Sequence, residues 1–222
     1  MSAPLPYNPL DKKNLGASVA EALLGRRPAP LSELPSFDGA GIYAIYYTGD
    51  FAAHASLAKR NQGNRFEAPI YIGKAVPQGA RKGAGGLDAS STKALFKRLG
   101  EHAESIRGTK LNLADFQCRY LVVDDIWIPL GESLLIAKFA PIWNSIIDGF
   151  GNHDPGSGRY KGMRPRWDVL HPGRAWATKC ADRPESAASI ISEVKEYLRS
   201  TPIPANPHFY AEQTRASYDA SS

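Results

Sequence analysis

The sequence has few of the features that mark secreted, membrane or fibrous proteins. Its 222 residues include only two cysteines, Cys118 and Cys180, too few for a disulfide framework or a structural zinc site. No stretch approaches the roughly 18 consecutive apolar residues that a membrane-spanning helix needs. The first residues lack the basic and then apolar pattern of an export signal. We therefore expect a cytoplasmic protein that contacts no membrane.

The composition is ordinary for one globular domain, with 43% apolar and 22% charged residues. The net charge is +5, from 27 basic and 22 acidic residues, and the excess is uneven. Residues 151–180 contain two acidic residues and six basic ones, namely Arg159, Lys161, Arg164, Arg166, Arg174 and Lys179. A concentrated positive surface is what binding to a phosphate backbone requires. A surface that is merely soluble explains the charge equally well.

Apolar patterns predict an order of elements. Runs of β-branched and aromatic residues predict strands at 41–47, 68–74 and 117–124. Apolar residues at helical spacing predict helices at 14–24, 92–107, 131–140 and 184–200. Three prolines argue against any regular element in 26–37. This order indicates an α/β (α+β) layer, with a small mixed or antiparallel sheet covered by helices.

We interpret residues 1–222 as a single domain with extensions. Residues 48–67 are too many for a tight turn and predict an insertion at the tip of a hairpin. The remaining parts are an N-terminal arm at 1–37, a core at 38–148 and a C-terminal extension at 149–222.

Several side chains in these elements could carry chemistry, although each has an ordinary explanation. Tyr43 and Tyr71 lie on strands that we expect to pair, where most tyrosines only pack. Arg98 and His102 are four residues apart on one helix and share a face. We place that face apart from the apolar stripe of Leu95 and its neighbours, where such a pair is usually solvated.

Two further polar residues follow. Glu132 is expected to open a helix, where an acidic side chain commonly complements the helix dipole. Asn144 lies in an otherwise apolar stretch, so that its amide must find hydrogen-bond partners. Neither residue indicates a function alone.

As an ordered set these residues resemble the GIY-YIG nuclease superfamily. The set is Gly41-Ile42-Tyr43, Tyr71-Ile72-Gly73-Lys74, Arg98, His102, Glu132 and Asn144. The resemblance covers residues 39–147, and it implies a three-stranded antiparallel sheet flanked by helices. It also implies hydrolysis of DNA phosphodiester bonds with one divalent metal ion per active site, which we expect to be Mg²⁺.

The long insertion and the segment 147–174 narrow the resemblance. They are similar to the branch of small type II restriction endonucleases that cut GC-rich palindromes. The gap between the two tyrosine motifs is longer than in many members of the superfamily, and the restriction branch tolerates such an insertion. A DNA methyltransferase is then expected in the same system, without direct contact implied.

Phosphodiester hydrolysis assigns roles to the polar members. Glu132 is the expected metal ligand, because Mg²⁺ usually binds through one or two carboxylates, waters and phosphate oxygens. Arg98 can offer two parallel N–H groups to a phosphate oxygen. Asn144 is expected to orient the tyrosines or to brace the helix of Glu132.

A tyrosine can accept the proton of the attacking water only if its pKa falls below about 10. We favour Tyr43 as this general base, coupled to His102, with Tyr71 positioning water or phosphate. The reverse assignment of the two tyrosines stays open.

One such set per chain implies a homodimer for cutting both strands of double-stranded DNA, and a palindromic target matches its two-fold symmetry. The C-terminal extension at 149–222 is our candidate for DNA recognition, and the insertion at 48–67 is expected to form either a dimer contact or a clamp on the DNA backbone. Candidates for DNA contacts are Lys74, Arg159, Lys161, Arg164 and Arg166. Arginine is the natural partner of guanine in the major groove, although a phosphate contact explains each arginine at least as well.

Other interpretations remain. A nuclease of the same superfamily could act in repair or in mobile-element cleavage, and a non-catalytic module could bind DNA without cutting it. The cluster Gly83-Ala84-Gly85-Gly86 does not follow a strand directly and lacks a Gly-Lys-Ser/Thr sequence, so we reject nucleotide binding.

Overall fold

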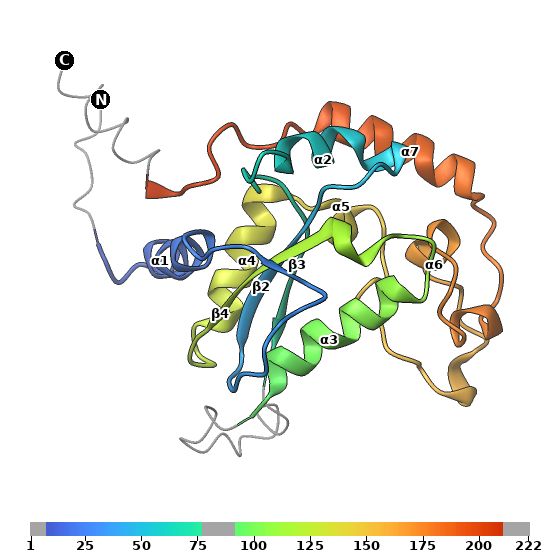
Figure 1. Cartoon of the computed structure of the whole chain (residues 1–222), viewed down its shortest axis with the longest axis horizontal. Coiled ribbons are helices and arrows are strands. Elements are labelled where there is room, and N and C mark those ends of the chain that lie inside the picture. Colours follow the sequence, from blue (N-terminus) through green and yellow to red (C-terminus); the bar gives the residue numbers. More distant parts are fainter. Residues whose placement is uncertain (1–7, 77–91, 211–222) are drawn as a thin grey trace.

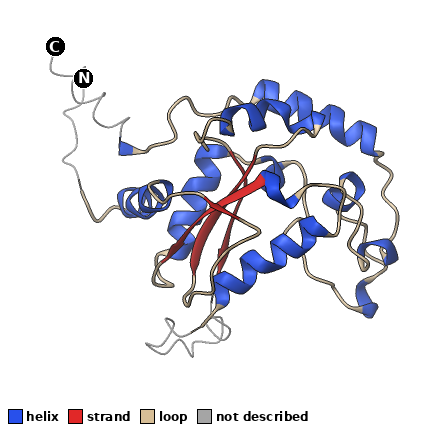
Figure 2. Ribbon diagram, viewed as in Figure 1, coloured by secondary structure: helices blue, strands red, loops and turns tan. Residues whose placement is uncertain are grey.

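The computed structural model describes residues 8–76 and 92–210. The glycine-rich cluster at 83–86 lies outside the described residues. At the centre is an antiparallel sheet with helices on both faces (Figures 1 and 2). Its strands, in the order β1-β4-β2-β3, are β1 (Ala29–Pro30), β2 (Gly41–Tyr47), β3 (Pro69–Ala75) and β4 (Phe116–Val122). The described residues form the α-helices α1 (Lys12–Leu24), α2 (Ala55–Asn61), α3 (Ala94–Arg107), α4 (Ile128–Phe139), α5 (Ile142–Ser145), α6 (Arg166–Leu170) and α7 (Ala187–Ser200).

The sheet has four strands and not the three that the resemblance implies. The additional strand, β1, pairs Ala29 with Cys118 and Pro30 with Gln117 of β4. Three prolines argued against a regular element here, and that prediction was wrong. An edge strand tolerates proline because only one of its sides is paired. The next residue, Leu31, still donates its N–H to the β4 backbone at 3.0 Å.

Strand β2 is central, and all seven of its residues are buried. It pairs with β3 on one side and with β4 on the other. Its odd-numbered residues pack into one apolar cluster and its even-numbered residues into another, as the two-residue period of a strand dictates. At the start of β2, a Cβ on Gly41 would overlap the carbonyl oxygen of Leu121. Only glycine therefore fits at the first position of the first motif.

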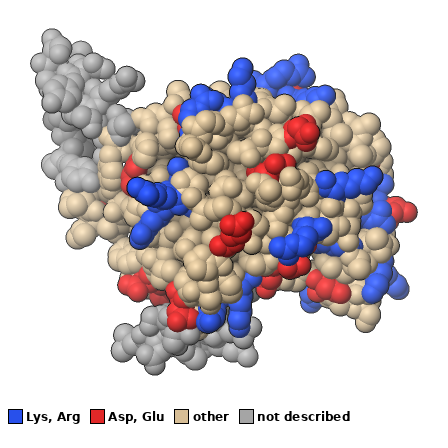
Figure 3. All heavy atoms as spheres, in the orientation of Figure 1, with Lys and Arg blue, Asp and Glu red and all other residues tan. Residues whose placement is uncertain are grey.

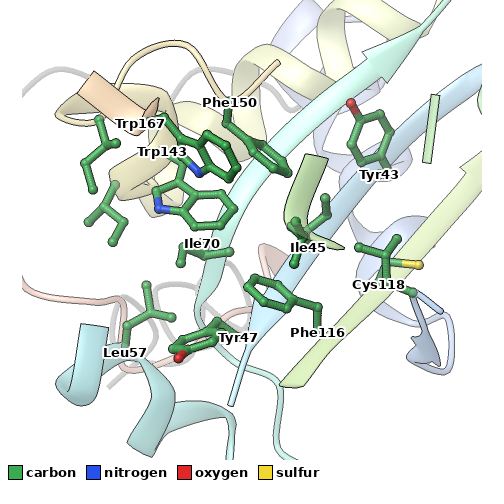
Figure 4. Packing of buried hydrophobic residues seen from close by; sticks show 14 of the residues in the cluster. Tyr43, Ile45, Tyr47, Leu57, Ile70, Phe116, Cys118, Trp143, Phe150 and Trp167 are labelled. Carbon is green, nitrogen blue, oxygen red and sulfur yellow. The ribbon is translucent and has the colours of Figure 1, made fainter. Parts of the chain in front are cut away.

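The two clusters show which helices cover which face. Helices α1 and α4 cover the face of the even-numbered residues with Ala20, Leu23, Leu24, Ile128, Leu135 and Phe139. The other face is covered by α3 and by the C-terminal half of the chain. In Figure 4 the rings of Trp143, Trp167 and Phe150 lie together beside Ile70 of β3.

The insertion at 48–67 folds back onto the core. Residues 52–54 form a short 3-10 helix, η1 (Ala52–His54), which leads into α2 and contacts α7 (Figure 1). The buried amide of Asn61 donates to the backbone oxygens of Tyr47 and Ala68 at 2.9 and 2.8 Å, and it accepts from the N–H of Ala68 at 2.9 Å. One side chain thus joins both ends of the insertion, and β2 and β3 remain neighbours across it.

Helix boundaries correct one detail of the sequence analysis. Helix α4 begins at Ile128, three residues before the predicted start, because Pro129 occupies its first turn, a position where proline needs no N–H partner. Glu132 therefore lies beyond the first turn and does not cap the helix. Within the described residues, no helix is long and apolar enough to cross a lipid bilayer.

Two histidines are buried where the insertion meets the C-terminal half. His54 is 0% and His171 is 4% exposed, and their ring centroids lie 5.7 Å apart. Among the described residues, neither ring nitrogen of His54 has a hydrogen-bond partner, and Nε2 of His171 has none. Burial lowers the pKa of His54 to about 3 and that of His171 to about 4. Both rings are therefore neutral at neutral pH.

These histidines predict that acid destabilises the fold. The unfolded chain takes up protons near pH 6.5, whereas the folded chain resists them down to about pH 3 and 4. Between pH 6.5 and 5, each histidine should lower the free energy of unfolding by about 1.4 kcal/mol per pH unit, or roughly 4 kcal/mol for the pair. Urea unfolding at pH 7.5 and 5 measures this loss.

The variant His54→Leu should reduce the measured loss by about 2 kcal/mol, the share of one histidine. His102 is also buried with a lowered pKa, and its contribution stays in this variant. The variant His208→Gln alters a histidine with a 49% exposed side chain and should keep the full loss. An unchanged pH dependence in His54→Leu would contradict the prediction.

Candidate active site

Two tyrosines from neighbouring strands lie at the base of the site. Tyr43 of β2 pairs in register with Gly73 of β3, and the rings of Tyr43 and Tyr71 have centroids 6.2 Å apart. Gly73 leaves room for both rings: a Cβ there would overlap the hydroxyl of Tyr43 and approach Cε1 of Tyr71 to 3.0 Å. Tyr43 is fully buried, whereas Tyr71 is half-buried and lines an open cleft.

His102 of α3 faces the buried tyrosine. Its Nε2 lies 2.5 Å from the hydroxyl oxygen of Tyr43, and its ring stacks on Phe150 at 4.5 Å. His102 was predicted to lie on a face apart from the apolar stripe, and that prediction was wrong, since His102 is only 1% exposed. Leu95, Leu99 and His102 follow each other at intervals of four and three residues, so they share one face of a helix.

Arg98 lies one turn earlier on α3, at the mouth of the site. Its guanidinium donates to Glu101 at 2.9 Å, to Nε2 of His153 at 2.6 Å and to the carbonyl oxygen of Gly151 at 2.6 Å. The side chain is 19% exposed. Arg98 therefore presents a permanent charge to the cleft from a partly buried position.

The cleft has a volume of about 820 Å³, and Tyr71, Lys74, Arg98 and Glu132 are among the residues that line it. Glu132 of α4 forms an ion pair with Lys74 of β3, with 2.6 Å between Oε2 and Nζ. The carboxylate side chain is 16% exposed. Elements far apart in the sequence thus bring one tyrosine, several basic side chains and the carboxylates of Glu101 and Glu132 to a single hollow.

Asn144 of α5 lies behind the cleft and contacts the backbone of β3. Its Oδ1 accepts from the N–H of Ile72 at 2.8 Å, and its Nδ2 donates to the carbonyl oxygen of Ile72 at 2.8 Å. Ile72 stands between Tyr71 and Gly73. The amide therefore holds the strand that carries Tyr71, and among the described residues its hydrogen bonds go to Ile72 and not to a tyrosine hydroxyl or to Glu132.

Burial decides the protonation states of the inner residues. It raises the pKa of Tyr43 well above its ordinary value, and it also raises the pKa of Tyr71, while the charge of Arg98 offsets part of both effects. Burial, reinforced by the charge of Arg98, lowers the pKa of His102 well below its ordinary value. In the resting protein both phenols are therefore protonated, and His102 is neutral, so that one of its ring nitrogens can accept a hydrogen bond.

The residues of the cleft suit one kind of metal ion. Within the described part of the chain, no three His, Cys, Asp or Glu side chains converge on a common point. A closed zinc site needs about four protein ligands, so this arrangement does not fit zinc. Two carboxylates, those of Glu101 and Glu132, line the open cleft, and Glu101 is paired with Arg98. One or two carboxylates fit Mg²⁺, which keeps several waters and takes its other ligands from phosphate oxygens.

Two of the predicted DNA contacts are engaged within the protein. Arg164 forms an ion pair with Asp182 at 2.9 Å, and Arg166 forms one with Glu193 at 2.6 Å. The Arg166 side chain is only 16% exposed. Both guanidinium groups therefore have acidic partners within the C-terminal half of the protein.

The other basic residues of this segment differ from one another. Arg174 is buried, forms an ion pair with Asp168 and lies over the ring of Trp167. Arg159 and Lys161 are exposed, and neither side chain has an ion-pair partner among the described residues. On the face in Figure 3, Lys and Arg side chains are interspersed with acidic ones. Fewer of the basic side chains in residues 151–180 are therefore available for DNA than the sequence count indicates.

Three residues that contact the site were not singled out from the sequence. Phe150 stacks on His102, and Glu101 and His153 both contact Arg98. The glycines at 149 and 151, which flank the aromatic ring of Phe150, are the only local signal for a close approach. Glu101 and His153 carry no distinguishing pattern, because their role depends on a loop that returns to α3.

This antiparallel sheet, with a tyrosine on each of two paired strands and an arginine, a histidine and a glutamate from the covering helices, is the arrangement expected of a GIY-YIG nuclease. A comparison with models of protein families assigns the chain to one family within this class. Residues 35–198 match the family model described as the Eco29kI GIY-YIG domain. The chain belongs to this family of type II restriction endonucleases. A comparison with curated proteins finds no match.

Family membership defines the chemistry at a coarse level. The domain is that of a nuclease of the restriction type, a hydrolase whose substrate is DNA. The match continues to residue 198, past the 39–147 stretch that contains the sequence motifs. The C-terminal half is therefore part of what defines the family.

The packing around Gly73 makes a prediction about the site. In Gly73→Ala the new Cβ would overlap the buried Tyr43 hydroxyl and should displace it from His102. A displacement of about 1 Å can reduce a catalytic rate about 100-fold. We expect a loss of that order in DNA cleavage under single-turnover conditions.

Gly100→Ala is the matched control for this prediction. Position 100 lies in α3, and a methyl group added there would have nothing within 4 Å beyond its own helix and chain neighbours. This change should preserve cleavage and stabilise the helix by about 0.5–1 kcal/mol. Full activity in Gly73→Ala would show that the contact between Tyr43 and His102 is not needed.

Proposed function

We propose that this protein is a type II restriction endonuclease that hydrolyses both strands of a GC-rich palindromic site in double-stranded DNA. In this proposal it acts as a homodimer and uses Mg²⁺. The observation that carries the proposal is the cleft in which Tyr71, Arg98 and Glu132 converge, with the Tyr43–His102 pair directly behind. Such a cleft joins an anion-binding side to a proton-accepting side.

The open side of the cleft is suited to the scissile phosphate. Arg98 and Lys74 supply positive charge to the cleft from two different elements, α3 and β3. Arg98 can form parallel hydrogen bonds to phosphate oxygens, whereas Lys74 acts as a point charge. Lys97 adds a further exposed cation on the cleft wall. These residues would orient the phosphate and neutralise charge that develops on it.

Glu132 would hold the metal ion. When bound, Mg²⁺ supplies Lewis-acid stabilisation of the leaving oxygen. In its absence the carboxylate is neutralised by Lys74 at 2.6 Å. Lys74 therefore has two uses in this proposal: it balances Glu132 in the free protein and contacts phosphate in the complex.

The buried side would take the proton of the attacking water. Tyr43 has a raised pKa, so it does not act as a free phenolate. It can accept a proton only while it transfers its own to His102, whose Nε2 lies 2.5 Å away. Substrate phosphate brings negative charge beside Arg98, which opposes the effect of Arg98 on His102. Tyr71, at the cleft wall, would position the water.

Specificity and dimerisation extend the proposal. Arg159 and Lys161 are the candidates for contacts to guanine or to the DNA backbone, because Arg164 and Arg166 are occupied by ion pairs. Each chain provides one catalytic set, so cutting both strands of a palindrome calls for two copies. A methyltransferase that protects the same site in the host would complete the system.

Cleavage of unmethylated plasmid DNA tests the function. With Mg²⁺ the protein should give discrete fragments whose sequenced ends define one GC-rich palindrome, and EDTA should stop the reaction. Glu132→Ala should cut at least about 100-fold more slowly, since metal stabilisation contributes several kcal/mol, and should still shift DNA in a gel. Glu196→Ala, which alters an exposed glutamate of α7 paired with Arg199, should cut normally.

Other outcomes of this experiment would overturn parts of the proposal. A smear or nicked circles would indicate a nuclease without restriction specificity. A gel shift without cutting by the unaltered protein would indicate a binding module. Cutting by Glu132→Ala at the unaltered rate would remove Glu132 as the metal ligand.

The pH dependence separates a relay from a free phenolate. A free phenolate base would make the single-turnover rate rise tenfold per pH unit up to the raised pKa of the tyrosine. A relay to neutral His102 should not follow that slope between pH 6 and 9, because His102 stays neutral throughout. Tyr43→Phe should lose about 100-fold or more at every pH, and Tyr71→Phe should lose less.

The two variants also test which tyrosine is the base. A larger loss in Tyr71→Phe would reverse the assignment of the tyrosines. Equal and small losses in both variants would argue against any tyrosine base.

A further inference from the structure

The guanidinium of Arg98 is held from the side of the loop that follows Phe150. His153 Nε2 and the carbonyl oxygen of Gly151 both lie 2.6 Å from guanidinium nitrogens of Arg98. Glu101, on α3 itself, holds a third position at 2.9 Å. Two of the three contacts therefore come from outside the helix that carries Arg98.

The contact with His153 requires one particular form of the imidazole. An arginine side chain has only N–H donors, so Nε2 of His153 must accept the hydrogen bond and the ring must be neutral. A protonated ring would place a second positive charge against Arg98. The imidazole side chain is 65% exposed, so it does not contribute to the apolar core. Its described contacts are with Arg98 and Glu101.

Gly151 makes the approach of the loop possible. A Cβ at this position would lie 2.7 Å from the hydroxyl of Tyr71 and 3.0 Å from an Arg98 guanidinium nitrogen. Any other residue would require either the loop or the ends of these two side chains to move. The backbone at 151 is therefore fitted to the catalytic cleft and not merely near it.

A buried arginine fixes the loop from below. Arg174 donates to the carbonyl oxygens of Gly149, Phe150 and Asn152 at 2.9, 3.1 and 3.1 Å. Its charge is balanced by Asp168, which is also buried. These three anchors, on both sides of Gly151, leave this part of the loop little freedom, so it can act as a rigid support for Arg98.

The same loop leads into the free basic residues. A groove of about 440 Å³ is lined by His153, Arg159 and Trp176, among others, and His153 also lines the catalytic cleft. His153 thus stands between the hollow where we propose phosphodiester hydrolysis and the hollow where Arg159 is exposed.

From this geometry we infer that His153 is a positioning residue for Arg98, which it holds from the loop that carries the proposed DNA-contacting residues. The inference rests on the proposed function, in which Arg98 binds the scissile phosphate. His153 acts through Arg98 and does not itself touch the reacting atoms. The Gly151 carbonyl oxygen assists it, and Arg174 keeps the loop in place.

Two variants of His153 test this role. His153→Gln can keep an acceptor for Arg98, whereas His153→Ala removes it. His208→Ala is the matched control, because His208 is also an exposed histidine paired with a carboxylate, that of Glu21 at 2.8 Å. Unmethylated plasmid DNA and the full-length protein are used throughout. Thermal unfolding should be unchanged in all three variants, since both imidazoles are exposed.

The first measurement separates rate from binding. His153→Ala should lower the single-turnover cleavage rate on the order of 10-fold or more, as the loss of a positioning contact does. Its affinity for the plasmid in a gel-shift titration should stay within about twofold. His153→Gln should restore most of the rate. A weaker gel shift with an unchanged rate would make His153 a DNA contact and overturn the inference.

The second measurement does not depend on cleavage. Nitrogen NMR of arginine side chains should show slow rotation of the Arg98 guanidinium in the unaltered protein and in His153→Gln. Rotation should be fast in His153→Ala. Unaltered Arg98 signals in His153→Ala would overturn the inference. Failure of the unaltered protein to cut DNA, with the NMR result as expected, would instead reject the proposed function.

Discussion

The hydrogen bond between the buried phenol of Tyr43 and His102 is the interaction on which the arrangement of the site depends. Tyr43 stands in the central strand, where both faces of the sheet are covered, so its hydroxyl is shielded from bulk solvent. A buried hydroxyl without a partner costs about 1–3 kcal/mol. The fold meets this requirement with an imidazole from α3, and that contact fixes how α3 is rotated against the sheet.

The rotation of α3 in turn places the remaining groups. With His102 facing inward, Arg98 one turn earlier reaches the mouth of the cleft. Gly73 must lack a side chain because the two phenol rings occupy the space above it. Phe150 closes the far side of the imidazole by stacking on it. The site thus divides into a dry inner part, where protons are held by burial, and an open outer part that carries the charges.

Much of this could be predicted from the sequence, and the reasons for the failures are physical. The strands at 41–47 and 68–74 and their pairing followed from β-branched and aromatic runs, because local propensity and burial agree there. Strand β1 was not predicted, because an edge strand of two residues can form by pairing with β4 and needs no strand propensity of its own. Helix α4 was placed three residues too late because Pro129 stands in its first turn, where the missing N–H of a proline needs no partner and a helix can begin without an apolar pattern.

The charged residues show where sequence reasoning ends. Arg159, Arg164, Arg166 and Arg174 look alike in a count of charge, and the fold gives them different tasks. Arg174 is buried in an ion pair, Arg164 and Arg166 bridge surface segments, and Arg159 stays exposed. Which arginine is free depends on where acidic residues such as Asp182 and Glu193 arrive after folding, and no local pattern encodes that.

The loop at 149–153 explains why one of these arginines is buried with its charge. A buried charge pair is a costly way to stabilise a protein, because desolvation of both ions opposes their attraction. Arg174 offsets that cost with three carbonyl contacts to a single loop, the loop that reaches Arg98 through Gly151 and His153. An apolar residue at position 174 could fill the space but could not hold three carbonyl oxygens in place. The ion pair of Arg174 and Asp168 is therefore best explained by the loop geometry that it fixes, and not by a contribution to the stability of the fold.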